Sequence, residues 1–191
     1  MKNLEEQMSV YAAYHQDARN KATHFIGVPA IVLSLFIPLA WLRIEAGGIT
    51  LTAAMAVAAA LLVYYCLLDF PLGLAMIVVM AALGWIGHQI AGLGATHGWI
   101  WFALLFVGGW ILQLVGHVFE GRRPALADNL FQALVAPIFL AAEAFFALGY
   151  KPDLHRRVNQ SAQLSRAQSA ESSISLERTS SRSGESGSRS A

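Results

Sequence analysis

Residues 99–119 read WIWFALLFVGGWILQLVGHVF, an apolar stretch without Asp, Glu, Lys or Arg. A helix needs roughly 20 residues to cross the hydrocarbon core of a bilayer, so this stretch is long enough to span one. Further apolar blocks occupy residues 25–43, 50–68, 72–92 and 130–150. The chain is 13% charged, whereas a soluble domain is about a quarter charged. The sequence therefore predicts an all-α fold, a polytopic transmembrane bundle of four to five membrane helices.

The composition changes abruptly near residue 155. Beyond this point Ser, Arg, Gln and Glu dominate, with almost no large apolar side chains. Such a segment cannot bury enough surface to offset the entropy lost on ordering. We therefore expect a membrane-embedded domain over residues 1–154 and a disordered Ser/Arg-rich tail over residues 155–191. The single cysteine, Cys66, excludes an intramolecular disulfide and a multi-cysteine metal site.

Two polar segments that carry histidine border the apolar blocks. Residues 14–24, YHQDARNKATH, precede the first block, and residues 113–120, QLVGHVFE, close the fourth. Histidine, Asn and Glu are costly at a membrane boundary unless they pair, bind a metal or take part in chemistry. Basic side chains flank the first block and follow the fourth: Arg19, Lys21, Arg122 and Arg123. The positive-inside rule puts both segments on the cytoplasmic face, so the two polar segments should meet.

The fifth block, residues 130–150, conflicts with five full crossings. Lys151, which follows it, also favours the cytoplasmic side, and an odd number of crossings would place it outside. The block contains Pro137 and Glu143, which are typical of a broken or re-entrant segment. We therefore expect four complete crossings and one incomplete crossing.

His15 and His24 are nine residues apart. On one straight helix they would point to opposite sides, so they can serve one metal only if the helix breaks or starts between them. Asn20 or Thr23 could cap such a start. Without a break, either histidine is a surface or capping residue.

His117 and Glu120 are three residues apart and therefore share a helix face. Alone, the pair also fits a hydrogen-bonded helix end. Together with the N-terminal histidines it favours a site for iron, zinc or copper, since several imidazoles with one carboxylate suit these metals. His88 lies near the far end of the third block. It becomes a ligand only if that block is embedded more deeply than the topology predicts.

The run GWILQLVGHVFEGRRPALADNL, residues 109–130, closely resembles the signature of the 2-hydroxy fatty acid dioxygenase family, known from fungal fatty-acid α-oxidation. The N-terminal segment matches as well, at Tyr14-His15, Asn20, His24 and Val28-Pro29. The resemblance covers about residues 8 to 153. It implies that residues 1–154 form a catalytic domain, an Fe(II)-dependent membrane enzyme that shortens a 2-hydroxy fatty acid by one carbon. Such an enzyme uses O₂ and releases the carboxyl carbon as CO₂.

The resemblance also implies roles for individual residues. His15, His24 and His117 are the expected iron ligands, and His88 matches as a fourth, weaker candidate. Glu120, Asn20 and Arg123 are the expected catalytic residues. Glu120 is either a ligand or a partner that fixes an imidazole, and we favour the second role because the histidines supply enough donors. Arg123 can bind a substrate carboxylate through its guanidinium fork or serve as a topology anchor.

Two other functions fit the same residues. A zinc-dependent membrane lipid hydrolase would use the ligands to activate water. A transporter or scaffold would use the polar residues only to stabilise helix packing. A requirement for O₂ separates the first alternative from the dioxygenase, and bound metal excludes the second. The expected partners are a long-chain 2-hydroxy fatty acid, O₂ and the bilayer, with no nucleic acid. The expected location is the bacterial inner membrane or the endoplasmic reticulum.

Overall fold

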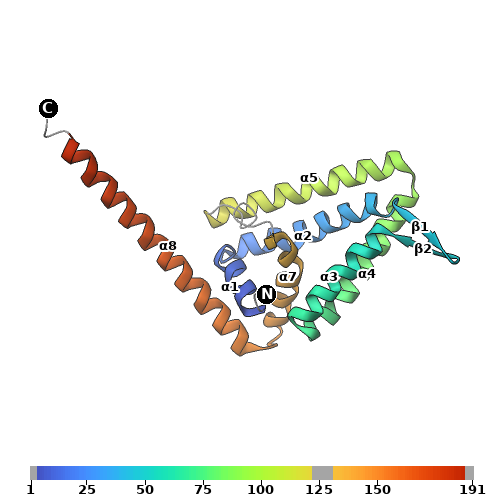
Figure 1. Ribbon diagram of the computed structural model, residues 1–191, viewed down its shortest axis with the longest axis horizontal. Coiled ribbons are helices and arrows are strands. Elements are labelled where there is room, and N and C mark those ends of the chain that lie inside the picture. Colours follow the sequence, from blue (N-terminus) through green and yellow to red (C-terminus); the bar gives the residue numbers. More distant parts are fainter. Residues whose placement is uncertain (1–3, 122–130, 188–191) are drawn as a thin grey trace.

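The computed structural model describes residues 4–121 and 131–187 (Figure 1). The elements are α1 Leu4–Ala13, α2 Ala18–Leu39, β1 Arg43–Ala46, β2 Ile49–Thr52, α3 Ala53–Leu68, α4 Phe70–Gly92, α5 Ala95–Glu120, α7 Phe131–Ala147 and α8 Pro152–Gly187. Within these ranges, α2, α4 and α5 are long and apolar enough to cross a membrane, while α3 and α7 are shorter apolar helices. These five helices coincide with the five apolar blocks, and the chain is a multi-pass membrane protein.

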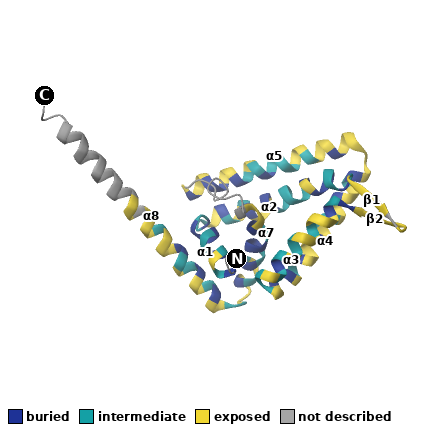
Figure 2. Ribbon diagram, in the orientation of Figure 1, coloured by how far each residue is buried: buried dark blue, intermediate teal, exposed yellow. Residues whose placement is uncertain are grey.

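The outward faces of the long helices are apolar. Large hydrophobic side chains such as Val78 of α4 and Leu104 of α5 expose 72% and 61% of their surface. Figure 2 shows exposed residues along much of both helices. Soluble monomers rarely expose a continuous apolar surface of this kind to water. In a membrane protein, lipid tails cover such a surface. The exposed faces therefore support the membrane setting independently of helix length.

The buried core lies around α7. Val135, Ile138 and Phe139 of this helix are completely buried and pack among side chains of α1 and α4. Pro137 lies inside α7, and Glu143 forms an ion pair with Lys21 of α2 at 2.7 Å. The fifth apolar block is thus a helix of 17 residues with one face buried in protein, and its incomplete crossing stays a prediction.

The chain turns sharply between α1 and α2, as a shared metal site for His15 and His24 requires. The side chain of Asp17 caps α2 by accepting the backbone N–H of Arg19 at 2.8 Å. Asn20 and Thr23, the expected caps, lie inside α2 instead. The hydroxyl of Thr23 donates to the backbone carbonyl of Asn20 at 2.8 Å. The break that a shared site requires is therefore present, and its cap is Asp17.

Helices α2 and α5 pack closely through glycines. A Cβ added at Gly109 would lie 2.7 Å from Cγ1 of Ile31 and 3.0 Å from the carbonyl oxygen of Gly27. A Cβ added at Gly116 would lie 2.5 Å from Oδ1 of Asn20. Small residues at membrane helix interfaces allow backbones to approach this closely. The approach brings the start of α2 beside the end of α5.

Strands β1 and β2 form a hairpin that the apolar blocks do not predict. Their register pairs Arg43 with Thr52, and the loop residues Gly47 and Gly48 have φ values of 60° and 80°. Two consecutive positive φ angles suit a tight hairpin turn, and glycine adopts them without strain. The helix of the second apolar block, α3, therefore begins at Ala53.

The predicted disordered tail over residues 155–191 needs a correction at its start. Helix α8 begins at Pro152, and its side chains Leu154, Val158 and Ala162 are buried against the core. Their spacing of four residues places them on one helix face. Composition alone did not reveal so narrow an apolar face. Farther along, α8 extends away from the other helices (Figure 1).

Candidate metal centre

Three imidazoles from separate parts of the chain converge where α1, α2 and α5 meet. His15 lies in the turn before α2, His24 near the start of α2, and His117 near the end of α5. Each offers a ring nitrogen, and these nitrogens all lie within 4.8 Å of one another. The three side chains are buried, with 1%, 2% and 6% of their surface exposed. The structure thus brings together the three histidines expected as ligands.

Backbone carbonyls orient two of these rings. Nδ1 of His15 lies 2.8 Å from the carbonyl oxygen of Tyr11, and Nδ1 of His24 lies 2.9 Å from that of Asn20. Because a carbonyl only accepts, each Nδ1 carries the proton and each Nε2 presents a lone pair. This is the second hydrogen bond that metal-binding histidines usually make.

The two lone pairs face each other. Nε2 of His15 lies 3.1 Å from Nε2 of His24. With both Nδ1 atoms protonated, this contact is repulsive unless a cation lies between the nitrogens. Two nitrogen ligands about 2.1 Å from one ion and at right angles to each other are about 3.0 Å apart. The observed separation therefore fits two ligands of one transition metal.

His15 is held in its neutral form. Its burial, and next the neighbouring imidazole of His24, lower the pKa of His15 to about 2. The ring of Tyr11 stacks on it, with centroids 4.0 Å apart and planes 6° from parallel. Neutral imidazole is the form that binds metals. His15 is thus ready to bind a cation without first losing a proton.

Three polar atoms in this region are buried without a hydrogen-bond partner among the described residues. They are Oδ1 of Asn20, Nε2 of Gln113 and Nδ1 of His117. More than about 90% of buried polar groups in proteins are paired. A cluster of unpaired atoms around three histidines therefore favours a bound group, and the donor set fits a metal.

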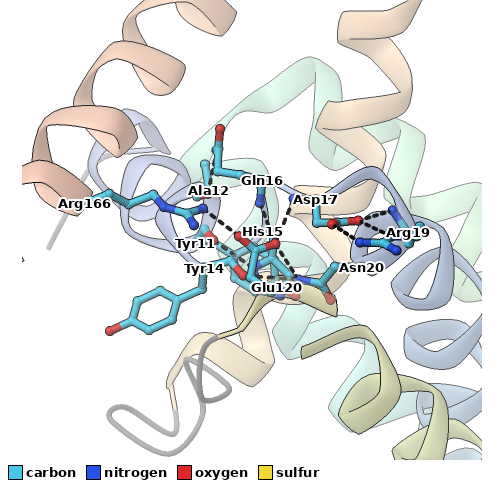
Figure 3. Close-up of polar contacts among 10 residues, drawn as sticks. All are labelled: Tyr11, Ala12, Tyr14, His15, Gln16, Asp17, Arg19, Asn20, Glu120 and Arg166. Atoms are coloured by element: carbon cyan, nitrogen blue, oxygen red, sulfur yellow. Dashed lines mark hydrogen bonds and ion pairs between the residues drawn. The ribbon is translucent and has the colours of Figure 1, made fainter. Parts of the chain in front are cut away.

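The carboxylate of Glu120 is occupied by the protein itself (Figure 3). Oε2 accepts the backbone N–H groups of Gln16 at 2.9 Å and Asp17 at 2.8 Å. It also accepts Nδ2 of Asn20 at 3.1 Å. Oε1 accepts Nη1 of Arg166 at 2.6 Å. Glu120 therefore fastens the turn after α1 to the end of α5.

This arrangement assigns Glu120 a different task from the one expected. The carboxylate holds the backbone next to His15, while carbonyl oxygens fix the tautomers of His15 and His24. Asn20 joins the same network, since its Nδ2 also donates to the carbonyl of Tyr14 at 3.2 Å. Both residues support the position of His15. Arg123 lies outside the described residues.

His88 does not join the cluster. It is exposed near the end of α4, and a Cβ added at its neighbour Gly87 would lie 2.9 Å from Cβ of Phe36. Phe36 and His24 are twelve residues apart on α2, which is about 18 Å along a helix. The sequence-based topology, which places His88 on the opposite face, agrees with this position.

A cavity of about 250 Å³ extends from the histidines between α2, α3, α5 and α7. One end is lined by His15, His24 and His117. Most of the remaining wall is apolar and includes Val28, Ile31, Leu35 and Leu39 of α2, Leu61 of α3 and Pro137 of α7. From His24 to Leu39 the α2 wall covers about 22 Å. The cavity thus joins an end lined by the three histidines to a long, mainly apolar channel.

Gln113 also lines the cavity, although the sequence did not single it out as a site residue. It lies four residues before His117 on α5 and so on the same helix face. This spacing of four residues is the one feature of the sequence that could have marked Gln113 as a site residue. The cavity lining places this residue beside the histidines.

Comparisons with known proteins identify the family of the chain. The family model described as 2-hydroxy-palmitic acid dioxygenase Mpo1-like matches residues 1–148. The chain is 39% identical over 161 residues to the 2-hydroxy-palmitic acid dioxygenase MPO1 of Saccharomyces cerevisiae, which covers 80% of this chain and 85% of the relative. No solved structure is similar to the chain. These matches confirm the resemblance carried by the two polar motifs, and the chain belongs to the Mpo1-like family.

Proposed function

We propose that this protein is an Fe(II)-dependent dioxygenase that shortens 2-hydroxy fatty acids by one carbon and releases CO₂. The observation that carries the proposal is the pair of facing Nε2 lone pairs of His15 and His24 at the polar end of an apolar cavity. The name of the yeast relative, a 2-hydroxy-palmitic acid dioxygenase, supports the substrate and the reaction class.

The proposed reaction balances with O₂ as the oxidant. One 2-hydroxy acid and one O₂ give the fatty acid one carbon shorter, one CO₂ and one water. The bond between C1 and C2 breaks, C2 is oxidised from an alcohol to a carboxylic acid, and O₂ takes up four electrons. When bound, iron would supply the activation of O₂ and a docking point for the oxygen-bearing end of the substrate.

The residues of the chain supply binding and orientation. Nε2 of His15, Nε2 of His24 and a ring nitrogen of His117 would hold the metal, and three ligands leave positions for substrate and O₂. Glu120 and Asn20 are positioning residues, since they act on the turn that carries His15. We also include Arg123, outside the described residues, as a guanidinium partner for the substrate carboxylate.

The apolar channel would hold the acyl chain. Its apolar walls come from α2, α3 and α7. Burial of each CH₂ group is worth about 0.8 kcal/mol, so a long chain gains much of its affinity from this wall. The carboxyl end is then left at the histidines, next to the metal.

The experiment that tests the proposal combines metal analysis with product analysis. Detergent-purified protein is reconstituted with Fe(II) under nitrogen and then given 2-hydroxyhexadecanoic acid with or without O₂. We expect near-stoichiometric iron, and pentadecanoic acid only with O₂. Equal conversion without O₂ would contradict the dioxygenase and favour a hydrolase. Failure to hold any metal after reconstitution would contradict the metal site and favour a scaffold.

A further inference from the structure

The carboxamide of Gln113 is a buried hydrogen-bond donor at the polar end of the cavity. The residue is 7% exposed, and its Nε2 has no acceptor among the described residues. An unpaired amide in an apolar setting costs stability, because it loses its bonds to water without replacement. Such a donor indicates an acceptor that the described chain does not supply.

Gly27 of α2 leaves room for this amide because it has no side chain. A Cβ added at Gly27 would lie 2.4 Å from Nε2 of Gln113. Any larger residue at position 27 would therefore push the amide away. The terminal torsion of a glutamine side chain is broad, so the amide can turn toward the cavity without leaving this space.

Three other donors in the cavity are already engaged. The hydroxyl of Tyr65 donates to the carbonyl of Leu134 at 2.8 Å. The Nδ1 groups of His15 and His24 face backbone carbonyls. Gln113 differs from these three residues because its donor is uncommitted while it shares their cavity.

We propose that Gln113 donates a hydrogen bond to a carboxylate oxygen of the bound 2-hydroxy acid and thereby selects acids over uncharged analogues of equal chain length. This inference rests on the proposed function for the identity of the substrate. A carboxylate suits the position because charge-assisted hydrogen bonds are about twice as strong as neutral ones. The bond would also fix the end of the acid beside the histidines, one helical turn from His117.

The test measures equilibrium binding under nitrogen, so that no turnover occurs. Two ligands are compared on the Fe(II)-loaded protein: 2-hydroxyhexadecanoic acid and hexadecane-1,2-diol, which lacks the carboxylate. Gln113→Met removes the donor and keeps an unbranched side chain of similar length. Gln89→Met is the matched control, since Gln89 is exposed near the far end of α4. Gln113→Leu serves as the second variant if the first is unstable.

We expect Gln113→Met to weaken binding of the acid by about 10- to 100-fold and to leave the diol affinity and the iron content unchanged. Gln89→Met should change none of the three. Unchanged acid affinity in the Gln113 variants would overturn the inference, as would equal losses for acid and diol or a loss of iron. Wild-type protein that binds neither ligand would instead overturn the proposed function, and this inference with it.

Discussion

Arg166 of α8 and Glu120 at the end of α5 form an ion pair of 2.6 Å between residues that lie 46 positions apart. The Glu120 side chain is almost completely buried, with 1% exposed. Its second oxygen holds the turn that carries His15. The C-terminal helix is thereby connected, through one carboxylate, to the histidine cluster (Figure 3).

Arg166→Ala should lower the free energy of unfolding by about 1 kcal/mol without loss of iron. Oε2 of Glu120 keeps its three donors, so the turn beside His15 remains fastened. Thermal unfolding in detergent and metal analysis measure the two effects. Arg156→Ala is the control, because its ion pair with Asp153 is exposed and should not matter. Loss of iron in Arg166→Ala would mean that α8 holds the site directly.

Glu120→Gln should weaken iron binding by about 10- to 100-fold, the usual effect of losing a group that supports a metal ligand. The neutral amide accepts the backbone N–H groups of Gln16 and Asp17 less strongly, so the His15 turn loosens. Competition with a chelator gives the Fe(II) dissociation constant. In the control Glu5→Gln, only a partly exposed pair with Arg157 is lost. Equal iron affinity in both variants would contradict this role of Glu120.

Substitution of single histidines by alanine should distinguish the histidines that bind iron from those that do not. His15→Ala, His24→Ala and His117→Ala should each lose most of the iron, because each removes one of the converging nitrogens. His88→Ala and His97→Ala should keep it, since both residues are exposed at the opposite end of the bundle. Metal analysis after Fe(II) reconstitution distinguishes the two groups. Iron loss in His88→Ala would show that α4 contributes a ligand.

Gly116→Ala should reduce both stability and iron content. Its Cβ would lie 2.3 Å from Oγ1 of Thr23 and 2.5 Å from Oδ1 of Asn20, so these two side chains must shift or α2 and α5 must separate. Gly108→Ala on the same helix meets nothing within 4 Å. It should stabilise α5 by up to about 1 kcal/mol, because glycine is a poor helix former. Equal unfolding temperatures for the two variants would show that the helices tolerate a wider separation.

Leu39→Trp should shift the preference toward shorter acids. Leu39 lies on the apolar wall, at the end of α2 remote from the histidines. A larger side chain there shortens the channel and leaves its polar end intact. The ratio of kcat/KM for 2-hydroxyhexadecanoic acid to that for 2-hydroxyoctanoic acid should fall at least about tenfold, which corresponds to 1.4 kcal/mol. Leu42→Trp, at an exposed residue just beyond α2, should leave the ratio unchanged.

Much of the fold follows from the sequence because a bilayer allows few solutions. The length and polarity of the apolar blocks predict α2, α4 and α5, since an unpaired backbone cannot lie in lipid. The basic flanks predict that His15 and His24 meet His117, although these residues are distant in sequence. Helix geometry gives the break between the two N-terminal histidines only as a condition for a shared metal site, and the structure has a turn there.

The features that the sequence did not predict depend on contacts that residue types do not reveal. Two of the four donors to Glu120 are backbone N–H groups, which every residue except proline carries, so no sequence pattern marks them. The packed face of α8 rests on three apolar side chains within a polar segment. In the sequence, Gln113 looks like any other glutamine near a helix end. Only the cavity that it lines distinguishes it. Each of these features requires the tertiary structure.

The apolar wall of the cavity has a consequence for kinetics. The channel lies among helices whose outer surfaces face lipid, and its substrate is itself a membrane component under the proposed function. The concentration that governs occupancy is then the mole fraction of the acid in the surrounding bilayer, whatever the volume of the aqueous phase. Other lipids in the same leaflet dilute the substrate, so membrane composition becomes part of the rate law.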